Sequence, residues 1–236
     1  VSDTLDAVTA VLTVSSNGVD EGAVDLVYTV ELQDANGDPV IANNIVTVTT
    51  TLGVITITAG DSSNTLTIPI QGDDAFIDAE TVSNAITAVV ETNAGQANSF
   101  ENLGYNGTTL VTEISDTIDT VTLTLNDLTV VEGSGTAQIT ASLDSAPQTE
   151  LTIVLSNGAT ITFGPAYVAG TDVSSTAFAI NNAEDLYLDS SSIALSVQSV
   201  TGGNFEDLDS SDTATVTVGD TTDIVTATLS VDRVAL

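Results

Sequence analysis

The 236-residue sequence contains no cysteine, histidine, lysine, methionine or tryptophan, and its single basic residue is Arg233. Without cysteine, no disulfide can hold the fold and no thiol chemistry is available. The absence of histidine and cysteine also excludes a nucleophilic triad and a typical zinc site. No apolar run approaches the roughly 20 residues of a membrane-spanning helix, so we expect no membrane insertion.

The chain is strongly acidic, with 33 aspartates and glutamates and a formal net charge of −32. It is nevertheless 42% hydrophobic, which is typical of folded domains and not of a disordered acidic tail. Such a surface would repel nucleic acid and anionic membranes and would attract divalent cations. A cysteine-free acidic chain of this kind is expected outside a bacterial cell.

A short motif, Asp-Thr-x-Asp, divides the sequence. It begins at Asp3, Asp116 and Asp220, about a hundred residues apart, which is the length of one small sandwich domain. We therefore expect a first module over residues 1–117 and a second over 118–221. Residues 222–236 would be the first strand of a following module or a donor strand.

Apolar residues alternate with polar ones throughout, as at Val8, Ala10, Leu12 and Val14, which indicates half-buried strands. In the first module this pattern predicts strands at 8–14, 24–32, 45–51, 54–58, 65–70, 82–91 and 108–114. In the second it predicts strands at 121–125, 137–143, 151–155, 160–163, 175–180, 193–200 and 213–218, with a hairpin turn at Asn157-Gly158. The expected fold is all-β, in tandem immunoglobulin-like β-sandwich modules.

Three acidic loops recur in both modules. Val-Asp-Glu-Gly at 19–22 matches Val-Val-Glu-Gly at 130–133, and the acidic loop at 73–78 matches that at 184–189. The segment 98–103 matches 203–208. Packing alone would not require acidic loops to be repeated in this way.

Sandwich topology would bring the first two loops and the exit of the last strand to one pole of a module. The acids expected there, around the first joint between modules, are Glu21, Asp73, Asp74, Asp78, Asp116 and Asp119. Glu206 and Asp207 of the second module would face the same joint. Carboxylates about 4 Å apart repel by about 1 kcal/mol even in water, and Ca²⁺, which takes six to eight oxygen ligands, would suit such a cluster. The alternative is that these loops only keep the protein hydrated.

The order of these motifs resembles the extender repeats of giant bacterial RTX adhesins, of the large-adhesion-protein type involved in biofilms. The second module carries most of the pattern, at residues 131–133, 155–161, 184–189 and 201–208. The resemblance implies immunoglobulin-like modules, joined by short calcium-binding linkers, that project an adhesive tip from the cell surface. The first module differs in its turn at Leu52-Gly53 and in a longer loop at 33–44.

Carried onto this sequence, the resemblance implies one set of calcium ligands at each joint. At the first joint these are Glu21, Asp73, Asp78, Asp116 and Asp119. At the second they are Glu132, Asp185, Asp189, Asp220 and Asp223, and Glu184, which aligns with Asp73, is a candidate beside them.

An enzyme is not expected. A glycosidase would need one acid protonated in an apolar pocket and another across a substrate cleft, whereas these acids lie in loops that connect strands. The chain also has only four tyrosines and five phenylalanines to stack against a sugar.

The C-terminal residues leave two structural functions open. Val225, Ala227, Leu229 and Val231 repeat the alternation of the first strand. The chain is either an excerpt of a longer array, with similar modules as end-to-end partners, or a subunit whose last strand completes the sandwich of the next copy in a filament. An apolar strand of this kind needs to be covered in either case.

Overall fold

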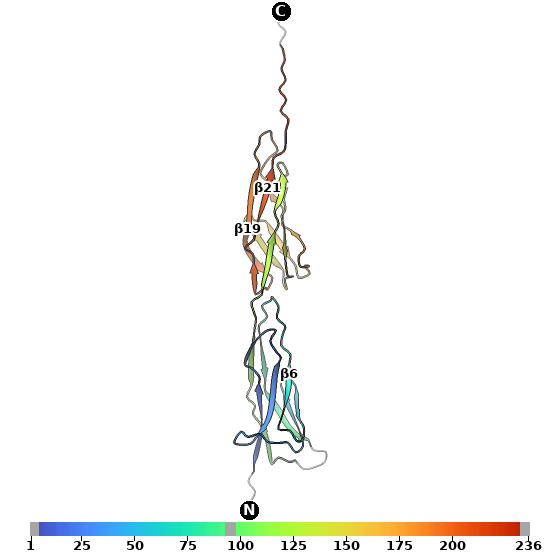
Figure 1. The fold of residues 1–236 in the computed structure, drawn as a ribbon, viewed down its shortest axis with the longest axis vertical. Helices are drawn as coiled ribbons and strands as arrows, with labels where there is room; N and C mark the ends of the chain where they lie inside the picture. Colours follow the sequence, from blue (N-terminus) through green and yellow to red (C-terminus); the bar gives the residue numbers. More distant parts are fainter. Residues whose placement is uncertain (1–4, 93–97, 232–236) are drawn as a thin grey trace, which may run out of the picture. The chain divides into compact units, whose positions relative to one another are not determined.

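The computed structural model describes residues 5–92 and 98–231, and every regular element in these ranges is a β-strand (Figure 1). The start of the first Asp-Thr-x-Asp motif and Arg233 lie outside the described residues. The chain divides into two compact units: residues up to 74 with 78–117, and residues 75–77 with 118 onward. Among the residues described, no helix has the length and apolar character needed to cross a membrane.

The described residues of the first unit form ten strands, which pair into three sheets. The sheet orders are β6-β3-β1-β9, β5-β4-β8 and β2-β10-β7. The strands are β1 (Ala7–Val14), β2 (Gly18–Asp20), β3 (Leu26–Gln33), β4 (Ile45–Thr50), β5 (Val54–Ile57), β6 (Ser63–Ile68), β7 (Glu80–Asn84), β8 (Ile86–Thr92), β9 (Asn102–Tyr105) and β10 (Leu110–Ser115).

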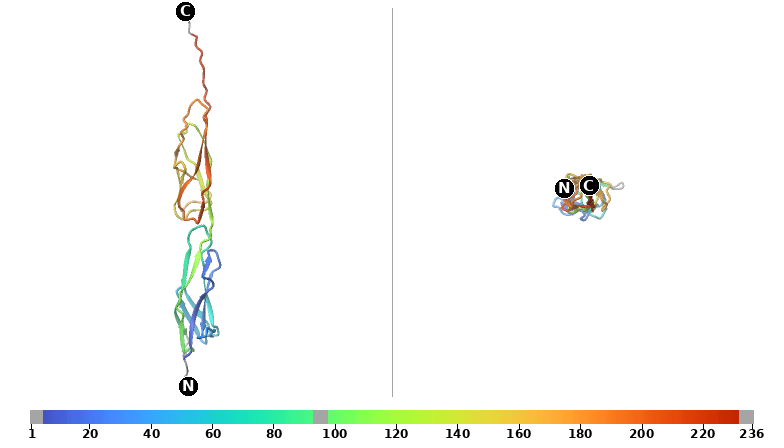
Figure 2. Two further views of the ribbon diagram at one scale, coloured as in Figure 1. Left: turned by 90° about the vertical axis from the view of Figure 1, so that its left-hand side faces the viewer. Right: turned by 90° about the horizontal axis from the view of Figure 1, so that it is seen from above.

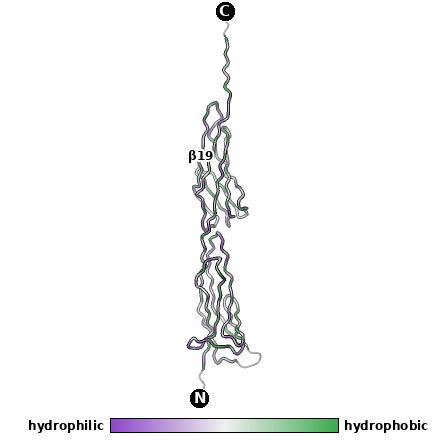
Figure 3. The backbone as a smooth tube through the Cα atoms, viewed as in Figure 1, coloured by the Kyte–Doolittle hydropathy of each residue, from purple (hydrophilic) through white to green (hydrophobic). Residues whose placement is uncertain are grey.

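The core of the first unit lies between the sheet of β1 and β3 and the sheet of β4, β5 and β8. Burial alternates along these strands, so their apolar side chains are shielded from water at every second residue. The hydropathy of the residues along the backbone is drawn in Figure 3. The inward set is Val8, Ala10, Leu12, Leu26, Tyr28, Val30, Leu32, Val46, Val48, Ile55, Ile57 and Ile86.

The first strand region changes sheets partway along. β1 pairs antiparallel with β3, whereas β2, four residues later, pairs parallel with β10. Within this unit β2 therefore ends beside the end of β10, at the end of the unit opposite to the start of β1 (Figures 1 and 2). This change of sheet brings residue 21 next to the residues with which the chain leaves the unit.

The second unit repeats this plan, with eleven strands in its described part. Its sheets have the orders β17-β14-β11-β20, β12-β21-β19-β15-β16 and β13-β18. The strands are β11 (Thr120–Leu125), β12 (Leu128–Val131), β13 (Thr136–Ala137), β14 (Thr140–Leu143), β15 (Leu151–Leu155), β16 (Thr160–Phe163), β17 (Val173–Ser174), β18 (Phe178–Ala179), β19 (Ser191–Gly202), β20 (Asp207–Asp209) and β21 (Thr213–Gly219).

The same change of sheet recurs in the second unit. β11 pairs antiparallel with β14, and β12 then pairs parallel with β21, the last strand. The predicted hairpin turn is present between β15 and β16, where the Gly158 N–H donates to the Leu155 carbonyl at 2.8 Å. Gly158 has a φ of 85°, which explains why glycine follows asparagine there.

The all-β, immunoglobulin-like sandwich predicted from the sequence is confirmed, with differences in detail. The strand expected at 82–91 is two strands, β7 and β8, in different sheets. Where β7 gives way to β8, the side-chain oxygen of the buried Asn84 accepts hydrogen bonds from the Thr51 hydroxyl and the Leu52 N–H. The strand expected at 137–143 is interrupted between β13 and β14, and the strand expected at 175–180 is reduced to the two residues of β18. Five short strands of the described structure, β2, β9, β12, β17 and β20, were not predicted.

One buried carboxylate holds together three segments of the first unit. Glu91, at the end of β8, accepts hydrogen bonds from the Asn44 side chain at 2.8 Å and from the Ser99 N–H at 2.9 Å. Burial raises the pKa of Glu91, but the hydrogen bonds from Ser99, Asn44 and Phe100 outweigh that effect and hold its pKa below the ordinary value. The charged form is therefore favoured in the folded unit.

We predict that Glu91→Gln destabilises the first unit at neutral pH by about 2 kcal/mol, because hydrogen bonds to a charged acceptor are replaced by weaker ones. Since the folded pKa is lowered, the advantage of the parent is present above the unfolded pKa of about 4.3. It is lost as the pH falls through the folded pKa. Calorimetric melting of both proteins between pH 3 and 7 tests this. Exposed Glu113→Gln is the control, and a parallel pH dependence of parent and Glu91→Gln would contradict the prediction.

Candidate metal centre

Each unit buries a glutamate close to the residues with which the chain leaves that unit. In the first unit this is Glu21, which directly follows β2. Its N–H donates to the carbonyl of Ser115, the last residue of β10, at 2.9 Å. The parallel pairing of β2 with β10 therefore sets Glu21 beside Asp116 and Thr117.

Gly22 lets the acidic loop at 71–78 come close to Glu21. The Gly22 N–H donates to the Gln71 carbonyl at 3.0 Å, and a Cβ atom at Gly22 would lie 2.7 Å from the Asp73 Cβ. Its φ of 68° is also in the left-handed region, which glycine adopts at low cost. The Glu-Gly pair of the repeated motif thus joins a buried acid to a close approach of the backbone.

The two oxygens of the Glu21 carboxylate have different surroundings. Only 4% of Glu21 is exposed. Its Oε1 accepts a hydrogen bond from the Thr117 N–H at 2.9 Å and a longer one from the Thr117 hydroxyl at 3.4 Å. Its Oε2 is buried without a hydrogen-bond partner. A buried polar atom left unpaired in this way needs a physical explanation.

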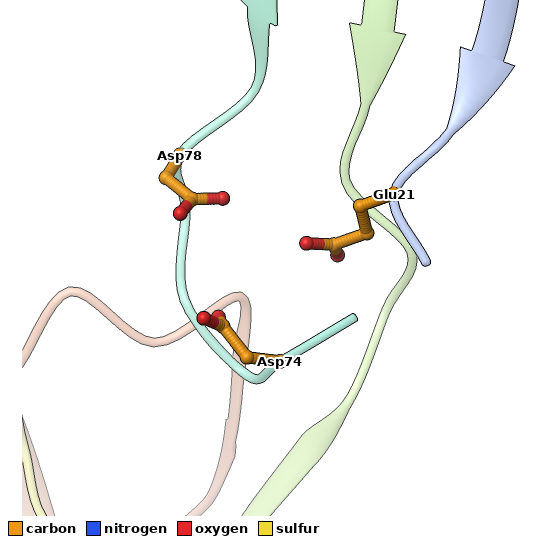
Figure 4. A group of neighbouring side chains, drawn as sticks. All are labelled: Glu21, Asp74 and Asp78. Atoms are coloured by element: carbon orange, nitrogen blue, oxygen red, sulfur yellow. The ribbon is translucent and has the colours of Figure 1, made fainter. Parts of the chain in front are cut away.

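Two aspartates face the buried glutamate. Asp74 and Asp78 come from the loop between β6 and β7, and their carboxylates turn toward that of Glu21 (Figure 4). One oxygen of each of the three residues lies within 4.8 Å of the others. We refer to Glu21, Asp74 and Asp78 as the first acidic cluster.

The other acids expected in this part of the first unit lie around the cluster. Asp73 accepts a hydrogen bond from the Thr117 hydroxyl. Asp116 Oδ1 accepts one from the Asp78 N–H at 3.3 Å, and the Gln71 side chain donates to Asp78 Oδ1 at 2.9 Å.

The second unit reproduces the arrangement around Glu132, which is 2% exposed and follows β12. Its N–H donates to the Gly219 carbonyl at 2.9 Å, so it lies beside the end of β21. Glu132 Oε1 accepts hydrogen bonds from the Thr221 N–H and hydroxyl, both at 2.8 Å, and Oε2 is buried without a hydrogen-bond partner. Gly133 has a φ of 72° and allows the loop carrying Glu184 to approach.

Asp185 and Asp189 complete this second acidic cluster. One oxygen of each lies within 4.8 Å of the other and of a Glu132 oxygen. Glu184 Oε1 instead lies 2.7 Å from the Thr221 hydroxyl oxygen, which it shares with Glu132, and Asp220 Oδ1 accepts a hydrogen bond from the Asp189 N–H at 3.1 Å. Asp223 is exposed and is not a member of this cluster.

The remaining candidates lie elsewhere in the second unit, near the start of β11. The Asp119 N–H donates to Glu206 Oε2 at 2.7 Å, and the Thr120 hydroxyl donates to Asp207 Oδ2 at 2.8 Å. These bonds join the beginning of β11 to the parallel strand β20.

The charges within each cluster repel one another. Loss of hydration raises the pKa of Asp78, and the charges of Asp74, Glu21 and Asp116 raise it further. In the second unit, loss of hydration and then the charge of Asp185 raise the pKa of Asp189 in the same way.

The pKa of Glu132 is shifted in the opposite direction, downward. The N–H and hydroxyl of Thr221 hold the pKa of Glu132 below its ordinary value, so this carboxylate stays charged. With Arg233 as the only basic residue in the chain, little internal positive charge is available to balance these acids. Each cluster could hold a metal ion, because carboxylate oxygens that converge without a cation are destabilising until one binds.

The two threonines were not predicted as site residues. Thr117 and Thr221 are the second residues of the repeated Asp-Thr-x-Asp motifs. The exact repetition of threonine was the available signal, since an exposed linker does not by itself require a hydroxyl there.

Comparison with protein families finds one match, to the LapA domain, over residues 6–117 and again over 119–221. The comparison with curated protein sequences found no match.

Among solved structures, the similarities are distant. Two, titled CBD12 from CALX1.2 and calcium binding domain CBD12 of CALX1.1, each show 9% identity and a TM-score of 0.31, with 88% of this chain and 99% of theirs covered. A third, domains 4–9 of the surface layer protein SbsC, shows 14% identity and a TM-score of 0.21 over 89% of this chain and 31% of its own. At such TM-scores these similarities carry no conclusion about the chain.

The two family matches cover almost the whole sequence, and each contains one buried glutamate with its acidic cluster. The chain therefore belongs to the LapA domain family and comprises two tandem copies of that domain.

Proposed function

We propose that this chain is an extender segment of a bacterial cell-surface adhesin, in which Ca²⁺ binds at both acidic clusters and stiffens the joint that follows each domain. The function proposed for this member of the LapA domain family is mechanical. At the cell surface, an array of such domains would project an adhesive tip. Its partners would be similar domains placed end to end, and its function would be structural, not enzymatic.

The observation that carries the proposal is the unpaired oxygen of a buried glutamate, which is present in both domains. Glu21 Oε2 and Glu132 Oε2 are each buried without a hydrogen-bond partner, and each belongs to a glutamate that has a carboxylate oxygen within 4.8 Å of oxygens of two aspartates. Leaving such an atom unpaired is costly unless something else satisfies it. A bound cation would satisfy the oxygen and neutralise the neighbouring charges together.

Calcium is the cation that these ligands suit best. All the available side-chain ligands are oxygens, which exclude a typical zinc site. Ca²⁺ accepts six to eight oxygens at 2.3–2.6 Å in adaptable geometry, so oxygens within 4.8 Å of one another can share one ion. Mg²⁺ requires a stricter octahedron at about 2.1 Å and keeps much of its hydration shell.

The position of each cluster relates the metal to the linker. Thr117 and Thr221, which bind the two buried glutamates, lie on the segments through which the chain leaves each domain. A cation held by these glutamates would therefore fix the beginning of the linker on the domain. We propose that this restraint limits the angles available to the following domain.

A filament subunit is the alternative function, and it rests on the exposed C-terminal segment. Val225, Leu229 and Val231 are 72%, 93% and 87% exposed, and no strand pairs with residues 224–231 within the described structure. If this segment completes the sandwich of another copy, light scattering will show polymers that lengthen with concentration. Monomers at all concentrations would contradict the filament alternative.

The first prediction of the proposal concerns thermal stability. A ligand at about 100 times its Kd adds about 2.7 kcal/mol, and extracellular modules often bind Ca²⁺ with a Kd of about 10⁻⁴ to 10⁻³ M. Transfer from excess chelator to about 10 mM Ca²⁺ should therefore raise the melting temperature of each domain by on the order of 10 °C.

The matched control is the double variant Glu21→Gln/Glu132→Gln. Glutamine keeps a carbonyl oxygen for the threonine N–H and removes the charge that the metal would need. This variant should melt at the same temperature with chelator and with Ca²⁺. A parent protein whose calorimetric melting is unchanged by Ca²⁺ would refute calcium binding at these clusters.

The second prediction concerns the joint. Replacing Asp116 and Asp119 by asparagine should leave both sandwiches folded, because neither residue belongs to a hydrophobic core. If these charges help to hold the joint, the double variant in Ca²⁺ should sample more compact and varied shapes than the parent. Small-angle X-ray scattering measures this, and identical distance distributions in Ca²⁺ would show that the two aspartates do not restrain the joint.

A further inference from the structure

The threonine of each Asp-Thr-x-Asp motif contacts two carboxylates at once. Thr221 Oγ1 lies 2.8 Å from Glu132 Oε1 and 2.7 Å from Glu184 Oε1. A hydroxyl has one proton and can donate it to only one of these oxygens at a time. The Thr221 N–H donates in addition to Glu132 Oε1, so the glutamate is bound by a single edge of its carboxylate.

The same contacts are found in the other domain. The Thr117 N–H donates to Glu21 Oε1, and the Thr117 hydroxyl contacts both Glu21 Oε1 and Asp73 Oδ1. In both domains the second oxygen of the glutamate is the one that is buried and unpaired. The agreement between two domains of different sequence indicates that this orientation is a property of the motif.

We propose that Thr117 and Thr221 are positioning residues of the two cation sites. Each binds Oε1 of its buried glutamate and thereby directs Oε2 toward the two aspartates of the cluster. The inference rests on the proposed function, since the cation is its reason. Without the threonine, charge repulsion from the aspartates would turn the glutamate away, and binding would have to overcome the loss of rotamer freedom as well.

A second consequence concerns the acids beside the clusters. Glu184 and Asp73 share the threonine hydroxyl with the buried glutamate and are not members of the acidic clusters. We infer that Glu184 and Asp73 hold the threonine side chain in place and do not themselves bind the cation. Removing the charge of Glu184 should therefore weaken cation binding less than removing the charge of Asp185.

The second site can be observed separately because a tyrosine lies in its loop. The Tyr187 N–H donates to Asp185 Oδ1 at 2.7 Å, and the chain contains no tryptophan. Tb³⁺, which replaces Ca²⁺ at oxygen sites, should luminesce when excited through Tyr187. Tyr187→Phe identifies the part of the signal that arises at this site, and displacement by Ca²⁺ gives the Ca²⁺ affinity.

The test uses the full chain with single substitutions. Thr221→Val should weaken Ca²⁺ binding at the second site about tenfold, which corresponds to one charged hydrogen bond, whereas Thr221→Ser should bind like the parent. Glu184→Gln should remain within a few-fold of the parent and Asp185→Asn should not. Thr117→Val, the matched control in the other domain, should leave the luminescence titration unchanged.

Three other outcomes would contradict either the positioning role of the threonine or calcium binding itself. If Thr221→Val binds as the parent does, or if serine fails to restore binding, the positioning function is refuted while calcium binding stands. If Thr221→Val has lost its β-sheet circular dichroism in chelator, threonine is needed for folding and the inference also fails. If the parent binds neither Tb³⁺ nor Ca²⁺ in the titration or by calorimetry, the proposed function itself falls.

Discussion

The constraint on which both domains depend is a buried carboxylate that the chain itself does not neutralise. Glu21 and Glu132 are almost fully buried, each is next to two aspartates, and the sequence supplies one basic residue in all. Like charges about 4 Å apart repel by about 1 kcal/mol in water and by more where water is excluded. The parallel strand pairings and the glycines around each glutamate bring these charges close together.

These features act in sequence along the chain. The first strand region changes sheets, and the parallel pairing of β2 with β10 and of β12 with β21 carries the glutamate to the exit of its domain. Gly22 and Gly133 then admit the acidic loop, and the threonine of the exit segment binds one glutamate oxygen. A cation held at each cluster, as proposed above, would account for this convergence of acids at the exit of each domain.

The sequence contained enough information for the fold and for the general place of the acids. Alternation predicted the sandwiches, and sandwich topology placed the loop after the first strand beside the acidic loop and the domain exit. Adjacent acids could not be told apart, because Asp73 and Asp74 differ only in the direction of a loop side chain. The short strand β12 was missed because Leu128 and Val130 alone give too brief an alternation. Thr221 was missed because its hydrogen bonds are made to Glu132, 89 positions away in the sequence.

The most direct test of a cation at these clusters is a crystal structure grown in Ca²⁺, with anomalous diffraction recorded at a long wavelength where calcium scatters anomalously. The account predicts one anomalous peak between Glu21 Oε2, Asp74 and Asp78, and another between Glu132 Oε2, Asp185 and Asp189, each with oxygens at 2.3–2.6 Å. A structure in millimolar Ca²⁺ with both glutamate oxygens bound only to water, and without an anomalous peak at either cluster, would contradict it.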